Sequence, residues 1–543
     1  MKKGNFKAGL LVLPGLFTII GLQSCLKYPD LKPTNDVTSE TVYSTPAGYK
    51  QVLAKVYGAF ALTGNQGPAG NGDVQGIDEG FSDFYRLFWK AQELSTDEAV
   101  ISWGDVGIQD FHNMNWSSNN SFLTGLYYRC LYQITLCNDF IRESSDESLT
   151  KRGISGTDAD NIREYAREAR FLRAFQYWVL MDLYGNPPFA TETSAIGGAP
   201  PPQASRTQVF NYIESELKAI EPNMPAAKSN EYGRADKGAV WALLARLYLN
   251  AQVYTGTARY TDAMTYAKKV IDAGYSLLTN YKWLMLADNN LNNPEFIFTI
   301  NYDGLKTTGY GGTTFLTHAA VGGSMPSSSF GVSGGWSGIR ATKNLVNLFP
   351  DVGGIADKRA QFYTSGQNLE ISNLTDFTNG YAVTKYRNTR RDSIVVNNVK
   401  VPGPGQSQDF SDIDMPLFRL AEMYLIYAEG AIRTNADLAT ALSYINKLRG
   451  RAYSNDASST TGNITQSEMT LDFILEERAR ELYWEGFRRT DLVRYNKFVE
   501  TSYLWPWKGG IASGTSVDQY RKIYPIPSRD INANTNLAQN TGY

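Results

Sequence analysis

The chain has 543 residues and a formal net charge of −2 at pH 7, from 52 basic and 54 acidic side chains. This balance excludes a strongly basic face of the kind that binds nucleic acid, and the length suits several cores or one large composite domain. Aromatic residues are frequent, with 34 Tyr, 25 Phe and 10 Trp. Most of them would pack in a core, but such side chains also offer flat apolar faces to ligands.

The first residues have the pattern of an export signal. A start containing Lys2, Lys3 and Lys7 precedes an apolar stretch that ends at Cys25, in the box Leu-Gln-Ser-Cys. A membrane-spanning helix, an ordinary secretory signal and a lipoprotein signal are the alternatives. The cysteine directly after the Leu-x-Ser box favours the lipoprotein signal, in which acyl chains on Cys25 would hold the protein on a membrane. The predicted division is a signal peptide at residues 1–24, a lipidated tether at 25–36 and one domain at 37–543.

Apolar periodicity predicts a mainly α-helical protein. In the segment 236–254, for example, apolar side chains follow the i, i+3, i+4, i+7 pattern of a helix that packs on one side. The predicted helices come in pairs with small residues at their crossings, which resembles tetratricopeptide units packed against an irregular region. The helices are predicted at residues 161–184, 207–220, 236–254, 260–273, 416–434, 436–449 and 467–485.

Two further features of the chain lead to structural expectations. Between about residues 275 and 414, Gly, Ser, Thr and Asn become frequent and strand-like runs such as 296–300 appear, so we expect a loop-rich insertion with a few short strands. In 467–485, Glu476, Glu477, Glu481 and Glu485 are interleaved with Arg478 and Arg480, which predicts a solvated helix face with i, i+4 ion pairs.

The residue types expected of common active sites are sparse. His112 and His318 are the two histidines, and neither has a second His, Cys or acidic residue at metal-ligand spacing. There is no nucleophile elbow, phosphate loop or dinucleotide fingerprint, so no catalytic residue, cofactor or metal site is predicted. The run that begins at Asp288 has a single carboxylate and would be a weak calcium site. Cys130 and Cys137 are expected to be buried free thiols. A glycosidase needs only two carboxylates and remains the enzymatic alternative.

Three aromatic residues stand in glycine-containing loops. Trp103 precedes Gly-Asp, Tyr310 lies in Gly-Tyr-Gly-Gly, and Trp336 lies in Gly-Gly-Trp-Ser-Gly. Neighbouring glycines cannot bury a large ring by themselves, and they allow the backbone to hold it exposed. Each ring alone is more typical of packing than of ligand binding, and the case for a binding role depends on the family resemblance described next.

Several long motifs, in order along nearly the whole chain, resemble the SusD/RagB family of Bacteroidetes outer-membrane lipoproteins. They are the segments 168–175, 416–429, 445–449, 485–494, 524–527 and 539–543. Other segments are similar to the starch-binding members of the family, namely 76–80, 84–86, 233–237, 306–312 and 505–510.

The resemblance implies a set of binding residues. An arc of three aromatic rings that cradles a curved α-glucan would be formed by Trp103, Tyr310 and Trp336, with Asp78 and Arg86 as polar ligands to sugar hydroxyls. The starch-binding members have an asparagine three places beyond the first tryptophan, in Trp-Gln-Glu-Asn, whereas this chain reads Trp-Gly-Asp-Val and is one residue shorter there. Asp105 could replace the missing group, or the contact could be lost.

The resemblance also implies a function. Such lipoproteins are lipid-anchored in the outer membrane, exposed at the cell surface, and bind starch and maltooligosaccharides, that is, α-glucans. They deliver glycan to a TonB-dependent transporter of the SusC type, and they do not catalyse. The alternatives are a related lipoprotein for a different glycan or for peptides, a helical scaffold that binds only its transporter, and the glycoside hydrolase considered above.

Overall fold

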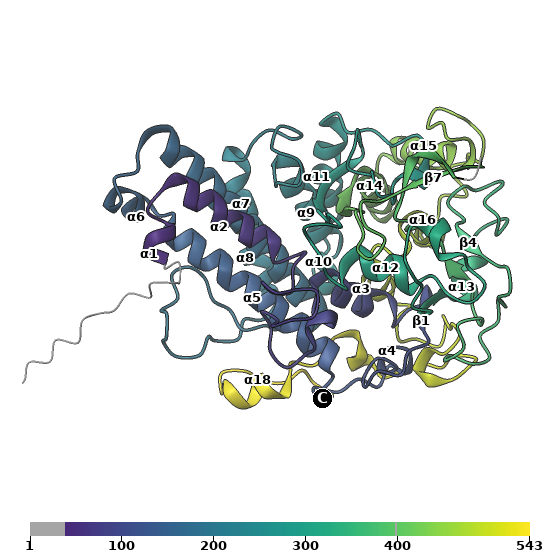
Figure 1. Cartoon of the computed structure of the whole chain (residues 1–543), viewed down its shortest axis with the longest axis horizontal. Helices are drawn as coiled ribbons and strands as arrows, with labels where there is room; N and C mark the ends of the chain where they lie inside the picture. Colours follow the sequence, from purple (N-terminus) through teal and green to yellow (C-terminus); the bar gives the residue numbers. More distant parts are fainter. Residues whose placement is uncertain (1–38, 397–398) are drawn as a thin grey trace, which may run out of the picture.

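The computed structural model describes residues 39–396 and 399–543, so the predicted signal peptide, the tether and Cys25 lie outside the described residues. The protein is mainly helical, with 45% helix and 8% strand. This confirms the predicted fold class. Figure 1 shows long helices in one half of the molecule and irregular segments with short strands in the other.

The helices of the N-terminal half pack side by side in the part of Figure 1 coloured purple and blue. The 29-residue helix α7 packs between α5 and α8, and α2 lies against both α5 and α7. Their apolar faces form one core that continues into the rest of the molecule. The helices of this half are α1 (Ser39–Val42), α2 (Pro46–Gly58), α3 (Phe84–Glu93), α4 (Asp110–Asn113), α5 (Ser121–Glu143), α6 (Asp146–Lys151), α7 (Gly156–Tyr184), α8 (Arg206–Ile220), α9 (Lys237–Leu249), α10 (Ala251–Thr255) and α11 (Tyr260–Asp272).

The C-terminal helices return to this scaffold. α14 packs against α11, which itself packs on α9, and α15 and α16 pack on α14, so the helices of this part also pack in pairs. These helices are α12 (Gly312–Ala319), α13 (Lys343–Val346), α14 (Leu420–Thr434), α15 (Leu438–Ser454), α16 (Leu471–Leu482), α17 (Arg488–Arg494) and α18 (Ser528–Ala533).

The loop-rich region carries most of the strands. Every sheet of the described residues has two antiparallel strands, in the pairs β1–β3, β2–β8, β4–β5 and β6–β7. The strand-like run at 296–300 is confirmed as β2. The strands are β1 (Ala99–Ile101), β2 (Phe296–Ile300), β3 (Ile339–Ala341), β4 (Phe362–Tyr363), β5 (Ala382–Val383), β6 (Thr389–Val396), β7 (Val399–Pro404) and β8 (Met415–Arg419).

Two of the predicted helices differ from the structure. The segment 236–254 is divided into α9 and α10 at Asn250, whose side-chain amide donates to the carbonyl of Arg246, 3.0 Å away. The segment 416–434 begins as strand β8 before it becomes α14. All five residues of β8 are buried, and the backbone pairs with β2. The pairing with a distant strand outweighs the local helical pattern.

The predicted solvated face on α16 is wrong except at Glu476, whose side chain is 51% exposed and lies 3.4 Å from Arg480. Glu477 and Glu481 are fully buried and meet arginines from other segments: Glu477 lies 2.8 Å from Arg359, and Glu481 lies 2.7 Å from Arg419. Burial alone would raise the pKa of Glu481, but the guanidinium groups around it lower the pKa to about 2. The arginines come from positions that no helical spacing reveals.

The two thiols are free and buried on α5, as predicted, and burial raises the pKa of Cys137 to about 12.

His112 is also buried, and its Nε2 accepts a hydrogen bond from the amide of Ile101 at 3.2 Å. Among the helices described, none is long and apolar enough to cross a membrane.

Candidate functional site

A short strand pair brings two distant tryptophans together. In the β1–β3 ladder, Ile101 lies opposite Ile339. Because the strands are antiparallel, the chain leaves β1 and enters β3 at the same end. Trp103 and Trp336, 233 residues apart, therefore meet there: the Trp103 Nε1 donates to the Trp336 carbonyl at 3.0 Å, and the ring centroids are 6.4 Å apart.

The third predicted ring completes a curved surface. Tyr310 precedes α12, is 37% exposed, and has its ring centroid 6.1 Å from that of Trp336. The planes of Tyr310 and Trp336 are inclined by 74°, and those of Trp103 and Trp336 by 46°. Each ring is turned relative to its neighbour, so the three rings do not form a flat platform. Trp336 stands between the other two, and all three line one hollow.

Arg86 of α3 lies beneath this arc and fixes its backbone. Its Nη1 donates to the carbonyls of Gly80 and Tyr310, each at 2.7 Å. The guanidinium carbon is 4.7 Å from the ring centroid of Phe81 and 5.7 Å from that of Trp103, within cation–π range. Burial lowers the pKa of Arg86 to about 10, so the group stays charged at neutral pH. Its Nη2 forms no hydrogen bond with the residues described.

The two predicted carboxylates lie at the edge of the same surface. Asp78 is the N-cap of a 3₁₀ turn, Glu79–Phe81, and its Oδ1 accepts from the amide of Gly80 at 2.9 Å. Asp105 is exposed, and within the described part of the chain its carboxylate has no hydrogen-bond partner.

The structure brings all six predicted glycan-binding residues to one hollow of about 660 Å³. This volume lies in the range of ordinary small-ligand sites. The hollow is lined by Ala69, Asp78, Gly80, Phe81, Arg86, Trp103, Asp105, Tyr310 and Trp336.

Two aromatic residues of the site were missed by sequence reasoning. Phe81 lines the hollow and stacks on Arg86. His318 lies behind Trp336, with ring centroids 4.7 Å apart and planes inclined by 25°, and its burial lowers its pKa. Trp336 is therefore supported by a stacked ring from α12, a role that the neighbouring glycines did not suggest. His318 is one of only two histidines in the sequence, and that was the only feature that set it apart. The residues near it in sequence do not indicate a contact with Trp336.

The described residues offer no obvious place for a metal ion, because no three His, Cys, Asp or Glu side chains among them are grouped for one. Asp288, the residue considered for calcium, is already paired: its Oδ2 lies 3.1 Å from the Nε of Arg391 and also accepts from the Arg391 amide.

The helical scaffold and the aromatic hollow are those of a protein that binds a ligand on its surface. Comparison with known proteins gives its family. A profile described as SusD family matches residues 294–543, and one described as starch-binding, associating with outer membrane, matches residues 78–249. The chain is 36% identical to the starch-binding protein SusD of Bacteroides thetaiotaomicron, over 96% of both chains, and 26% identical to a SusD-like protein of Bacteroides ovatus, over 74% of this chain and 71% of that one. The chain belongs to the SusD family of glycan-binding proteins, which are non-catalytic.

Solved structures share the fold. Surface glycan-binding protein A from Bacteroides uniformis superposes with a TM-score of 0.68 at 20% identity, covering 91% of this chain and 99% of that one. The protein of the same name from Bacteroides thetaiotaomicron, solved in complex with laminarihexaose, gives 0.65 at 19% with the same coverage. At these identities the likeness concerns the fold alone. Since the family is non-catalytic, the glycoside hydrolase alternative is set aside.

Proposed function

We propose that the protein captures α-glucans, starch and maltooligosaccharides, at the cell surface and helps deliver them to a TonB-dependent outer-membrane transporter of the SusC type. The observation that carries the proposal is the arc of Trp103, Tyr310 and Trp336 over one hollow. It is supported by the 36% identity, over nearly the whole chain, to a protein named for starch binding.

The chemistry of the hollow suits a sugar polymer. The C–H faces of glucose units would lie on the three rings, while hydroxyl groups would pair with Asp78, Asp105 and the unused Nη2 of Arg86. A helical α-glucan is already curved, so it would follow inclined rings with a smaller loss of conformational entropy than a flexible oligomer. Burying roughly 150 Å² of apolar surface, at about 25 cal/mol/Å², would contribute about 4 kcal/mol before that loss. Dissociation constants of roughly micromolar to millimolar would follow.

Asp105 fits the role of the asparagine that starch-binding members of the family have in this loop. Its carboxylate is exposed at the hollow and is not used by any described residue. A carboxylate accepts hydrogen bonds from hydroxyl groups at least as well as an amide oxygen does. We therefore propose replacement of the contact rather than its loss.

The proposed location follows from the leader and the family. The acyl chains on Cys25 would anchor the domain 37–543 to the outer membrane through the tether 25–36 and leave it exposed at the surface. The family description of outer-membrane association supports this placement, and the Leu-Gln-Ser-Cys box supplies the attachment point. Delivery to a transporter is proposed from the family alone.

The competing candidate is a different glycan, because a solved relative of the same fold carries laminarihexaose. Isothermal titration of the full chain, kept in a detergent without a sugar headgroup, against maltoheptaose, amylose, laminarihexaose and cellohexaose would decide. We expect heat of binding with the two α-glucans only. Preferential binding of laminarihexaose or cellohexaose, or no binding by any of the four, would contradict the proposal.

A further inference from the structure

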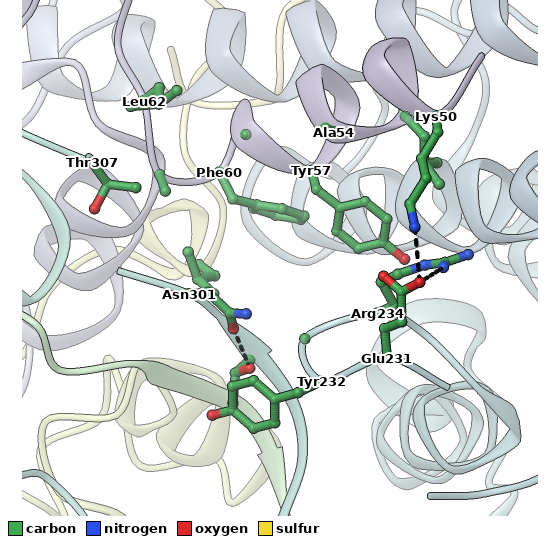
Figure 2. A pocket seen from close by; sticks show the side chains of 16 residues that line it. Lys50, Ala54, Tyr57, Phe60, Leu62, Glu231, Tyr232, Arg234, Asn301 and Thr307 are labelled. Atoms are coloured by element: carbon green, nitrogen blue, oxygen red, sulfur yellow. Dashed lines mark hydrogen bonds and ion pairs between the residues drawn. The ribbon is translucent and has the colours of Figure 1, made fainter. Parts of the chain in front are cut away.

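A second hollow, of about 310 Å³, lies outside the aromatic arc. Figure 2 shows it between α2, which supplies Tyr57 and Lys50, and the turn that carries Glu231 and Tyr232, with Asn301 at the end of β2 on the remaining side. The proposed function gives this hollow no role.

One side of the hollow presents an aromatic ring beside a free amide. Tyr232 is 48% exposed, and its hydroxyl donates to the Oδ2 of buried Asp414 at 2.8 Å. Asn301 is exposed, and its Oδ1 accepts from Thr299 at 2.6 Å. The Nδ2 of Asn301 donates to no described residue. It rests over Gly233, where an added Cβ would lie 2.1 Å from it, so the amide group is held next to the ring.

The charges around the hollow are compensated. Lys50 lies 2.9 Å from Glu231, and Arg234 pairs with Glu168 and, at 3.3 Å, with Glu231. The opposite wall is apolar and includes Phe60 and Leu53. An ionic ligand would find no unpaired charge here, whereas a neutral molecule with an apolar face and hydroxyl groups would find a ring, an amide donor and an apolar wall.

The second hollow is close to the first. Thr307 lines the second hollow and Tyr310 lines the aromatic arc. A chain spans at most about 3.6 Å per residue, so the Cα atoms of these two residues lie within about 11 Å of each other. The short segment 307–310 therefore borders both hollows.

We propose that this hollow is a second carbohydrate site, in which Tyr232 and Asn301 hold another stretch of the α-glucan that occupies the arc. The inference rests on the proposed function. Two sites on one polymer act together, because binding at the first raises the effective concentration at the second. A long glucan therefore gains affinity from the second site, and a short oligosaccharide confined to the arc does not.

The test is calorimetric titration of the full chain and its variants with amylose and with maltotriose. Tyr232→Ala should weaken amylose binding by about three- to tenfold, the size expected for one aromatic contact, and leave binding of maltotriose at the arc unchanged. Tyr232→Phe keeps the ring and loses the bond to Asp414, so it should bind amylose like the wild type. Asn301→Ala, which leaves Tyr232 in place, should weaken amylose binding even if Tyr232→Ala folds poorly.

The outcomes separate this inference from the proposed function. If the wild type binds amylose and both Tyr232→Ala and Asn301→Ala bind it equally well, the second site is wrong and the proposed function stands. If Tyr232→Phe loses as much as Tyr232→Ala, the effect belongs to the Asp414 hydrogen bond, and the inference is overturned. If the wild type binds neither amylose nor maltotriose, both the proposed function and the second site are wrong.

Discussion

The position of the Trp103 ring depends on one glycine. A Cβ placed on Gly338 would lie 2.6 Å from Cζ2 of Trp103, closer than two carbon atoms can approach without a shift. The ring is also held by its hydrogen bond to the Trp336 carbonyl. Glycine is needed here because a side chain would collide with the Trp103 ring. The backbone conformation does not require it, since Gly338 is not among the residues with positive φ.

Gly338→Ala should therefore displace the Trp103 ring and weaken α-glucan binding by about three- to tenfold, since one platform of the arc moves. Calorimetric titration measures this. Gly334→Ala is the matched control: it lies in the same loop, has no positive φ, and its added methyl group would meet nothing within 4 Å. Equal affinities of the two variants would show that the Trp103 ring is not part of the binding surface.

At the level of single residues, the sequence indicated the members of the site that lie in family motifs better than those placed by contacts across the fold. Trp103, Tyr310 and Trp336 were proposed from the family motifs, and the structure places them together. Phe81 and His318 were missed because their roles come from contacts with Arg86 and Trp336 across the fold. Such contacts leave no local pattern in the chain.

Helix α16 is an element whose burial the sequence did not reveal. An i, i+4 charge pattern normally marks a solvated face. Here the glutamates of that pattern contact Arg359, Arg419 and Arg451, which are all buried. Arg451 meets Glu481 at 2.5 Å and Glu295 at 3.2 Å. The element is therefore held by buried ion pairs, which are costly to break because one charge is left without a partner.

These pairs predict an acid-sensitive fold. Glu429 of α14 forms a similar buried pair, 2.8 Å from Arg494. Neighbouring arginines overcome the effect of burial and lower the pKa of both Glu429 and Glu481 to about 2, from 4.5. A carboxylate with a lowered pKa stabilises the folded state fully above pH 4.5, and this stability is lost as the pH falls from about 4.5 towards 2. Urea unfolding measured across this range should show the midpoint falling steeply.

Glu481→Gln should lower the free energy of unfolding at pH 7 by roughly 3–5 kcal/mol, because it removes one negative charge from a buried cluster that holds three arginines, and should make the acid dependence shallower. Glu476→Gln is the control on the same helix, since that side chain is 51% exposed and pairs with Arg480 at 3.4 Å; it should change stability by less than about 1 kcal/mol. A wild-type stability and slope in Glu481→Gln would contradict the account of α16.

Sequence periodicity predicted the bounds of helices that pack on one side. It was less accurate where pairing with a strand far away in the sequence determines the local structure. The helix predicted at 207–220 agrees closely with α8, and that at 260–273 with α11. The first residues of 416–434 form β8 because β2, more than 100 residues earlier, is available to pair. α5 was not assigned as a helix in advance, although both thiols that it carries were expected to be buried.

At the scale of the whole molecule, the helical scaffold supports a binding surface gathered from several separate segments. Arg86 comes from α3, Trp103 follows β1, Tyr310 precedes α12 and Trp336 precedes β3. In Figure 1, α3, α12 and β1 lie near one another in the half of the molecule away from α5 and α7. The rings are therefore mounted on packed elements, which would hold them in place before the ligand arrives.

The anchoring of the whole molecule can be tested at Cys25. Cys25→Ala should remove the acylation site, so the protein should leave the membrane fraction for the soluble or periplasmic fraction, because no other attachment is predicted. Fractionation of cells followed by immunoblotting measures this, with Cys130→Ala, which alters a buried thiol, as the control. Retention of Cys25→Ala in the outer membrane at the wild-type level would refute the lipoprotein prediction.

The central claim, capture of an α-glucan by the aromatic arc, is tested most directly by titrating amylose into Trp336→Ala. Loss of the middle ring should weaken binding roughly tenfold or more, with a modest decrease in melting temperature because His318 loses its stacked partner. Trp283→Ala removes a tryptophan that is 37% exposed and lies outside the hollow, and it should bind like the wild type. Wild-type affinity for amylose in a folded Trp336→Ala protein would contradict the account.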